Sequence, residues 1–169
     1  MRTEAQGATK GAIYVEFLIA FFPVFTMFLG LVQLADLHQA NIIVNHSAQM
    51  ATRAAAVILH DDPQFYGNDT SSIGKASGQR KDDIEHAAML GLLSSRSISE
   101  FKVSYPSTPG GTDNKDSYSR DDLVRVKVEA TFQCRVPFVN KLVCGSKSLR
   151  SIKSEAGFPN QGMGYTYSQ

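Results

Sequence analysis

The chain has 169 residues, enough for one small domain and an anchor. Its formal net charge is +1, from 17 Lys and Arg residues against 16 Asp and Glu residues, so the composition gives no electrostatic footprint for nucleic acid. Hydrophobic residues make up an ordinary 43% of the chain, but they are concentrated near the N-terminus.

An uncharged apolar run extends over 19 residues from Phe17 to Ala35. At about 1.5 Å per residue a helix of this length covers roughly 28 Å, close to the hydrocarbon thickness of a bilayer. Arg2 and Lys10 precede the run, and no further Lys or Arg occurs until Arg53. This asymmetry predicts a transmembrane helix over residues 12–35, with the N-terminus in the cytoplasm and the remaining chain outside.

Two simpler interpretations of the apolar run are a cleaved secretory signal and a plain single-pass anchor. The run is longer than the core of a cleaved signal, and no small-residue cleavage site follows it closely, so the plain anchor is the stronger of the two. Glu16 argues against a plain anchor, because a carboxylate at a membrane boundary is costly and is usually retained with a partner. Lys10 is the one cation near it on the same helix face, so a partner on another chain would resolve the cost.

The residues around this glutamate form a recognisable pattern. Gly11 and Ala12, followed by Glu16 and Phe17, resemble the processing site of type IV prepilins, in which a cytoplasm-facing peptidase cuts after the glycine. The resemblance implies a leader over residues 1–11 and a new N-terminus at Ala12. It also implies that the freed amine pairs with Glu16 of a neighbouring subunit during assembly.

Residues 11–37 are more specifically similar to the TadE-like family of the tight-adherence (Tad/Flp) pilus system. Members often have Gly-Ala-x-x-Val-Glu-Phe, a proline in mid-span and a glycine before the span ends. The matching positions here are Gly11, Ala12, Val15, Glu16, Phe17, Pro23 and Gly30. The resemblance, strongest over the first 60 residues, implies a structural minor pilin or pseudopilin and not an enzyme. The implied partners are other pilin subunits, a prepilin peptidase, the inner-membrane assembly platform and membrane lipid.

A second helical segment, residues 36–60, contains no Pro or Gly and is predicted to continue the helix as an amphipathic stem. The motif Asp61-Asp62-Pro63 is expected to end it. The predicted apolar stripe comprises Ile43, Val44, Met50, Ala51, Ala54, Ala55, Val57 and Ile58. This stripe either packs under the chain's own domain, the interpretation we favour, or contacts helices of neighbouring subunits, which small side chains also permit.

Residues 61–169 are predicted to form a small extracytoplasmic α+β domain. A polar loop over residues 64–78 leads to a short helix over 80–93. Alternating patterns then predict strands around 101–105 and 124–134, and a third strand is expected near 148–156. The expected product is a small antiparallel sheet laid on the stem, in agreement with the pilin-like arrangement that the resemblance implies.

Two cysteines, Cys134 and Cys144, flank an apolar loop. In an exported domain they are expected to form a disulfide, with two free thiols as the alternative. The loop residues are expected either to bury themselves against the stem, which we favour slightly, or to form a contact surface.

The sequence contains no recognisable arrangement for catalysis or metal binding. The histidines lack metal-binding spacing, and the acidic stretch over residues 110–122 does not match a calcium-binding loop, so no metal or cofactor is expected. The leading hypothesis is a bacterial inner-membrane protein with a periplasmic domain, involved in pilus assembly or adhesion. It is either incorporated into the filament, where its domain would be extracellular, or used only to prime one. A permanently anchored periplasmic binding or scaffold module is the alternative.

Overall fold

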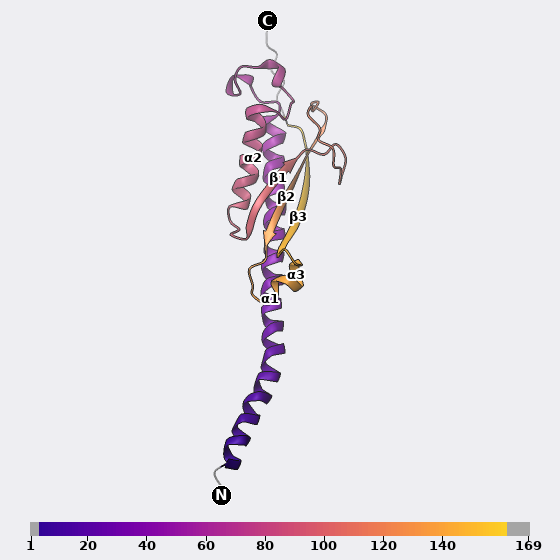
Figure 1. The fold of residues 1–169 in the computed structure, drawn as a ribbon. Coiled ribbons are helices and arrows are strands. Elements are labelled where there is room, and N and C mark those ends of the chain that lie inside the picture. The colour runs from indigo at the N-terminus through magenta and orange to yellow at the C-terminus, as the bar shows by residue number, and fades with distance from the viewer. Residues whose placement is uncertain (1–3, 162–169) are drawn as a thin grey trace.

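The computed structural model describes residues 4–161, with side chains described from residue 12 onward. One long helix runs the length of the molecule, and a small domain is mounted on its C-terminal half (Figure 1). The helices and strands are α1 (Glu4–Ile58), α2 (Gly78–Leu92), β1 (Ile98–Ser104), β2 (Leu123–Gln133), α3 (Asn140–Cys144) and β3 (Leu149–Pro159), with single 3₁₀ turns at Pro63–Phe65 and Thr70–Ser72. The α+β fold predicted from the sequence is confirmed.

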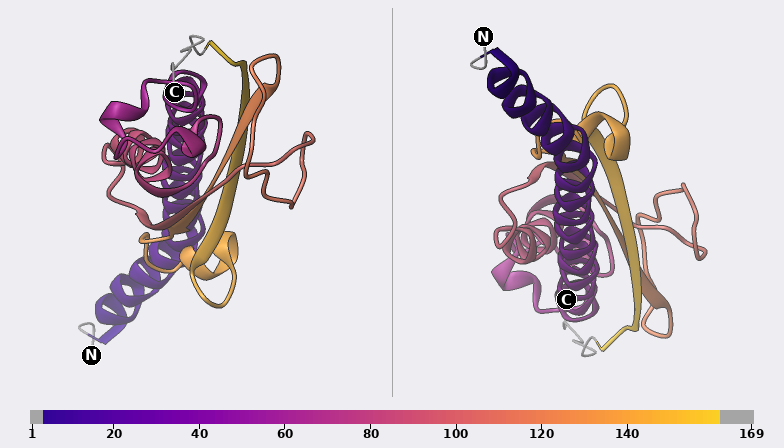
Figure 2. Two further views of the ribbon diagram at one scale, coloured as in Figure 1. Left: turned by 90° about the horizontal axis from the view of Figure 1, so that it is seen from above. Right: turned by 90° about the horizontal axis from the view of Figure 1, so that it is seen from below.

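The predicted membrane helix and stem form a single continuous helix, α1, which contains Pro23. Proline has no N–H to donate, so the helix loses one backbone hydrogen bond at this position. One turn later, the Thr26 hydroxyl donates to the Phe22 carbonyl at 2.8 Å. Figure 2 shows the N-terminal part of α1 inclined to the rest, a bend of the kind that an internal proline produces.

The buried face of the stem is made mainly of small side chains. It comprises Ala40, Val44, Ser47, Ala48, Ala51, Thr52, Ala55, Ala56 and Leu59. The predicted packing of an alanine-rich stripe under the chain's own domain is confirmed, but the position of the stripe was partly wrong. Val57 is exposed and Ile43 and Met50 are half-buried, because close approach of α2 and the sheet places small residues at the centre and larger ones at the edge.

Helix α2 approaches α1 closely enough that one position allows no side chain. A Cβ atom built on Gly91 would lie 2.8 Å from the Cα atom of Ser47. The Ser47 hydroxyl donates to the Ala88 carbonyl at 2.6 Å, so this crossing also has a buried hydrogen bond between the helices. Gly91 therefore sets the spacing between α1 and α2.

The three strands form an antiparallel sheet in the order β1-β2-β3. The inward face of the central strand follows the predicted alternation, with Val124, Val126, Val128, Ala130 and Phe132 all buried. On the outer face, the Oε1 atom of Glu129 lies 3.4 Å from the Nζ atom of Lys127 and 3.0 Å from the Nζ atom of Lys153. The sheet thus has one dry face on the helices and one charged face.

The C-terminal end of α1 is closed by Arg80, a contact that the sequence did not indicate. Its guanidinium donates to the carbonyls of Ile58 and Asp61 and lies 4.1 Å from the ring centroid of Tyr66. Carbonyls in the last turn of a helix lack partners within the helix and carry partial negative charge. The buried guanidinium of Arg80 supplies hydrogen-bond donors to these carbonyls and a positive charge that offsets their partial negative charge. This explains why Arg80 is tolerated at 1% exposure.

His60 provides a pH-dependent contact at the same end of the domain. Burial lowers the pKa of His60, and Arg120 and Arg80 add repulsion of the protonated form. In the neutral ring Nδ1 accepts from the Asn160 amide at 2.7 Å. The pKa of His60 in the folded state is below its unfolded-state value of about 6.5. The contact of the neutral ring therefore contributes fully to the free energy of unfolding above about pH 6.5. This contribution is lost as the pH falls through the folded-state pKa.

We therefore expect the free energy of unfolding to decrease as the pH is lowered from about 7.5 through the unfolded-state pKa of about 6.5. The measurement is denaturant unfolding of the full chain in detergent at several pH values, followed by near-ultraviolet circular dichroism. A His60→Gln variant should show a weaker pH dependence over this range. An equal dependence in both proteins would contradict the assignment.

Candidate functional site

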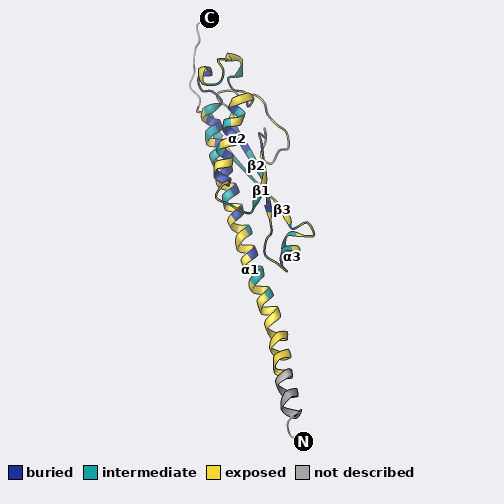
Figure 3. Ribbon diagram, turned by 60° about the vertical axis from the view of Figure 1, so that its left-hand side comes forward, coloured by how far each residue is buried: buried dark blue, intermediate teal, exposed yellow. Residues whose placement is uncertain are grey.

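Residues 12–32 of α1 form an apolar helix that the rest of the described chain leaves largely uncovered. No residue from Ala12 to Val32 is buried, and Gln33 is the first buried residue (Figure 3). We call residues 12–32 the bare segment. Exposed large apolar side chains are spread all around it: Ile13, Tyr14, Val15, Phe17, Leu18, Ile19, Phe21, Phe22, Val24, Phe25, Met27, Phe28, Leu31 and Val32.

By length and composition this part of α1 could cross a membrane. A helix that is apolar on all sides has to be covered by lipid or by other protein, because water solvates it poorly. Pro23 offers no N–H to the Ile19 carbonyl, and the other backbone groups of the segment can be satisfied within the helix, which is the condition for spanning a bilayer.

The bare segment carries one carboxylate, that of Glu16. The side chain is exposed, and no cation of the described residues lies within ion-pair distance. Beside it starts a ladder of aromatic rings, in which the centroids of Phe17 and Phe21 are 5.5 Å apart and those of Phe21 and Phe25 are 5.4 Å apart. Glu16 is therefore a polar group on a surface otherwise suited to apolar contact.

The predicted processing site precedes this carboxylate. The backbone of α1 is continuous through Gly11 and Ala12. The predicted leader, residues 1–11, lies outside the part of the chain whose side chains are described, so the structure does not test it. Ala12, Glu16 and Phe17 are all exposed on the bare segment and available to another molecule.

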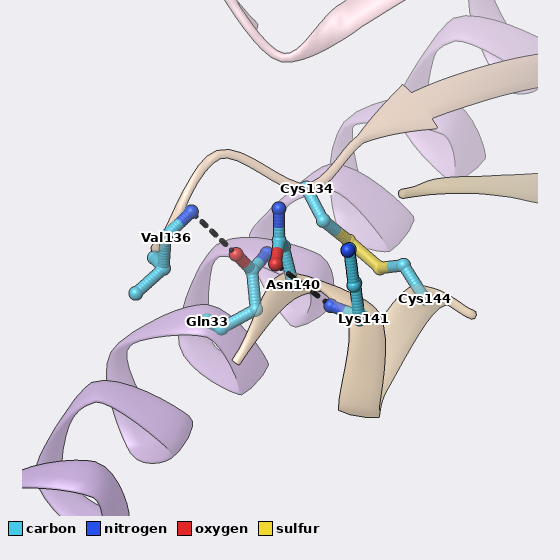
Figure 4. Close-up of a disulfide and its surroundings, with 6 residues drawn as sticks. All are labelled: Gln33, Cys134, Val136, Asn140, Lys141 and Cys144. Carbon is cyan, nitrogen blue, oxygen red and sulfur yellow. Dashed lines mark hydrogen bonds between the residues drawn. A yellow bond between two sulfur atoms is a disulfide. The ribbon is translucent and has the colours of Figure 1, made fainter. Parts of the chain in front are cut away.

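The predicted disulfide lies at the opposite end of the bare segment. Cys134 and Cys144 are bonded, with Cα atoms 6.4 Å apart, which confirms the predicted pair. Figure 4 shows how the enclosed loop meets α1: the Val136 N–H donates to the Gln33 side-chain oxygen at 3.0 Å. The predicted site residues are therefore not brought together, but lie at the two ends of one apolar helix.

The loop between the cysteines divides its apolar side chains between the stem and the outside. Val139 is buried, and a Cβ atom on Gly30 would lie 3.7 Å from it, an ordinary contact distance. Phe138 and Leu142 are instead 71% and 77% exposed. The expectation that the loop would bury itself was correct for Val139 and wrong for the two largest side chains.

Breaking the disulfide is expected to destabilise the domain by somewhat less than about 3 kcal/mol, the loop-entropy value for so short a ring. Thermal unfolding of the Cys134→Ser, Cys144→Ser double variant, followed by near-ultraviolet circular dichroism, measures the effect. Reductant should lower the melting temperature of the original chain and leave that of the double variant unchanged. An unchanged melting temperature in the double variant would contradict this expectation.

Two carboxylates of the acidic loop after β1 make contacts within the domain. Asp113 accepts from the Ser107 N–H at 3.1 Å, and Asp122 accepts from the Lys115 ammonium and the Ser119 N–H, each at 2.8 Å. The hydrogen bond from Lys115 lowers the pKa of Asp122. Among residues whose side chains are described, no group of three or more His, Cys, Asp or Glu side chains could hold a metal ion.

A long N-terminal apolar helix that carries a short helix and a small antiparallel sheet is a pilin-like arrangement. Comparison with known families adds a specific match: residues 11–53 fit the model of the TadE-like proteins, a family that is structural and not catalytic. The match starts at the predicted processing glycine and includes the whole bare segment, so the predicted TadE-like resemblance is confirmed and supports a protein associated with Tad pili. With the apolar helix, it also suggests a membrane-anchored protein. Searches of curated proteins and of solved structures found no match.

Two contacts at the end of the bare segment were missed from the sequence. Gln33 is 1% exposed and accepts a hydrogen bond from the backbone of the disulfide loop, and Val139 of that loop packs beside Gly30. The sequence does indicate that Gln33 is unusual, since it is an amide side chain within an uncharged apolar run. Its partner is 103 residues away in the sequence, and no local pattern identifies it.

Proposed function

We propose that this chain is a minor pilin or pseudopilin of a bacterial Tad-type pilus, processed after Gly11. Before assembly it is held in the inner membrane by the bare segment, with the N-terminus in the cytoplasm and the domain in the periplasm. The observation that carries this proposal is the position of Glu16 on an uncovered apolar helix, five residues after Gly11 and within the segment that matches the TadE-like model, with no cation among the described side chains in ion-pair distance.

The proposed mechanism follows from the cost of that carboxylate in an apolar environment. A charge inside a membrane or a protein core is stabilised when it is paired with an opposite charge. Cleavage after Gly11 would create such a charge, the α-amine of Ala12, near the Glu16 of each subunit. Pairing of the amine of one subunit with the Glu16 of the next would set the axial position of neighbouring helices, and the apolar side chains would then exchange lipid for helix–helix contact.

The domain would remain outside the core formed by the bare segments. The proposed partners of this chain are other pilin or pseudopilin subunits, the prepilin peptidase and the inner-membrane assembly platform. The charged outer face of the sheet would then be exposed at the periphery of the assembly, where the ion pairs of Glu129 tolerate water.

The test is the location of the chain in piliated cells. Pili are sheared from cells that produce the original chain or a Glu16→Ala variant, and both the sheared material and the membranes are probed for the chain. We expect the original chain in both fractions and the variant in membranes alone. If the original chain stays in the membrane and its deletion leaves piliation normal, the permanently anchored scaffold module is the better description.

A further inference from the structure

The disulfide-closed loop, residues 134–144, meets α1 where the bare segment ends. Val136 is hydrogen bonded to Gln33, and Val139 packs at Gly30. The helix from Ala12 to Gly30 has 19 residues, about 28 Å at the usual rise, which is the thickness of a hydrocarbon core. If this part of α1 spans the membrane, as the proposed function requires, the loop lies at the surface of the bilayer.

The loop presents apolar side chains that the domain leaves uncovered. Phe138 is 71% exposed and Leu142 is 77% exposed, on either side of the buried Val139. The backbone of Phe138 has a φ of 66°, in the left-handed region that bulky residues rarely occupy. Such a conformation is unfavourable and is retained where the surroundings or the function require it.

The charged residues close to these two side chains in the sequence are all basic. Arg135, Lys141, Lys147 and Arg150 are all exposed, and none has a carboxylate within ion-pair distance among the described residues. No acidic residue occurs from Ala130 to Ser154, although the chain as a whole is nearly neutral. Arg150 also lines an open groove of about 670 Å³ between α1 and β3, together with Leu34 and His38.

We propose that the loop 134–144 binds the membrane surface, with Phe138 and Leu142 inserted at the boundary between headgroups and acyl chains and the four cations facing anionic lipid headgroups. Aromatic side chains favour this boundary, and anionic headgroups attract each cation that lies near the surface. A lipid surface is favoured over a second copy of the chain, because the exposed apolar pair continues the bare segment at its end and the charged residues close to it in the sequence are all basic. Docking of the loop would fix the depth of α1, and with it the depth of Glu16.

The chain contains no tryptophan, which makes a direct depth measurement possible. The full-length Phe138→Trp variant is reconstituted into vesicles of phosphatidylcholine and phosphatidylglycerol, and quenching of its fluorescence by lipids brominated on their acyl chains is measured. Phe65→Trp is the matched control, because Phe65 is similarly exposed at 63% but follows the distal end of α1. Phe22→Trp, in the middle of the bare segment, reports on insertion of α1 itself.

We expect blue-shifted emission and at least twofold stronger quenching for Phe138→Trp than for Phe65→Trp. Adding Arg135→Glu and Lys141→Glu to Phe138→Trp should weaken the quenching at least twofold in vesicles with phosphatidylglycerol. Lys75 and Lys102 are two exposed cations elsewhere in the domain, and adding Lys75→Glu and Lys102→Glu to Phe138→Trp should leave the quenching unchanged.

Quenching of Phe22→Trp without quenching of Phe138→Trp would overturn the loop proposal and leave the anchor intact. Absence of quenching in Phe22→Trp would overturn the membrane anchorage on which both proposals rest. Blue-shifted but unquenched emission of Phe138→Trp that grows with the protein-to-lipid ratio would show that a second copy covers the loop, and would also overturn the proposal.

Discussion

Replacement of Glu16 by glutamine is expected to leave membrane insertion unchanged and to reduce incorporation of the chain into pili at least a hundredfold. Glutamine is close to glutamate in size, so the apolar packing of the bare segment is preserved. What is lost is the partner of the neighbouring subunit's α-amine. An ion left unpaired in a buried site costs about 3–5 kcal/mol, which corresponds to a hundredfold or more in an equilibrium.

The measurement compares the amount of the chain in sheared pili with that in membranes, for the original chain and the variant. Thr26→Val is the matched control, because Thr26 is a second polar side chain on the bare segment whose hydroxyl is already satisfied by the Phe22 carbonyl. This control should assemble normally. Normal assembly of Glu16→Gln would remove the role assigned to the carboxylate.

Replacement of Gly91 by leucine is expected to destabilise the domain by about 3 kcal/mol, the upper part of the usual range for overpacking a core. A Cβ atom at this position would already lie 2.8 Å from the Cα atom of Ser47 and 3.0 Å from its Cβ atom. The close atom belongs to the backbone of α1, so it cannot move aside as the end of a flexible side chain can. The two helices would have to separate, and the buried hydrogen bond from Ser47 to Ala88 would be strained.

Thermal unfolding of the full chain in detergent, followed through the near-ultraviolet signals of the buried Tyr105 and Tyr118, measures this effect. Gly30→Ala is the matched control, since Gly30 is also a helical glycine but has room for a methyl group, with its nearest neighbour at 3.7 Å. Alanine is also a better helix former than glycine, so this variant should be as stable as the original or slightly more stable. An unchanged melting temperature for Gly91→Leu would show that α2 does not pack on α1 at this place.

Features that depend on local periodicity could be predicted from the sequence. The alternation along residues 124–134 identified the central strand and its buried face, and the motif at residues 61–63 located the end of the long helix. The disulfide followed from composition, because two cysteines in a domain expected to lie outside the cell tend to pair. The strand and the helix end are indicated by residues that are close together in the sequence, and the disulfide by the residue types present.

Features that depend on distant contacts could not be predicted in the same way. The buried position of Arg80 requires knowledge that the end of α1, 22 residues earlier, has carbonyls to satisfy. The predicted apolar stripe wrongly included the exposed Val57 and the half-buried Ile43 and Met50, since the centre of the buried face is determined by where α2 and the sheet approach. For the candidate site, the sequence supplied the residues of the bare segment but not the loop that adjoins its end at Gln33.

The central claim is that this chain is cut after Gly11 to expose an amine for assembly. Mass spectrometry of the chain extracted from membranes tests it most directly, in cells with and without the prepilin peptidase. The account predicts a chain that begins at Ala12 when the peptidase is present and at Met1 when it is absent. An intact Met1 in cells that contain the active peptidase would contradict it.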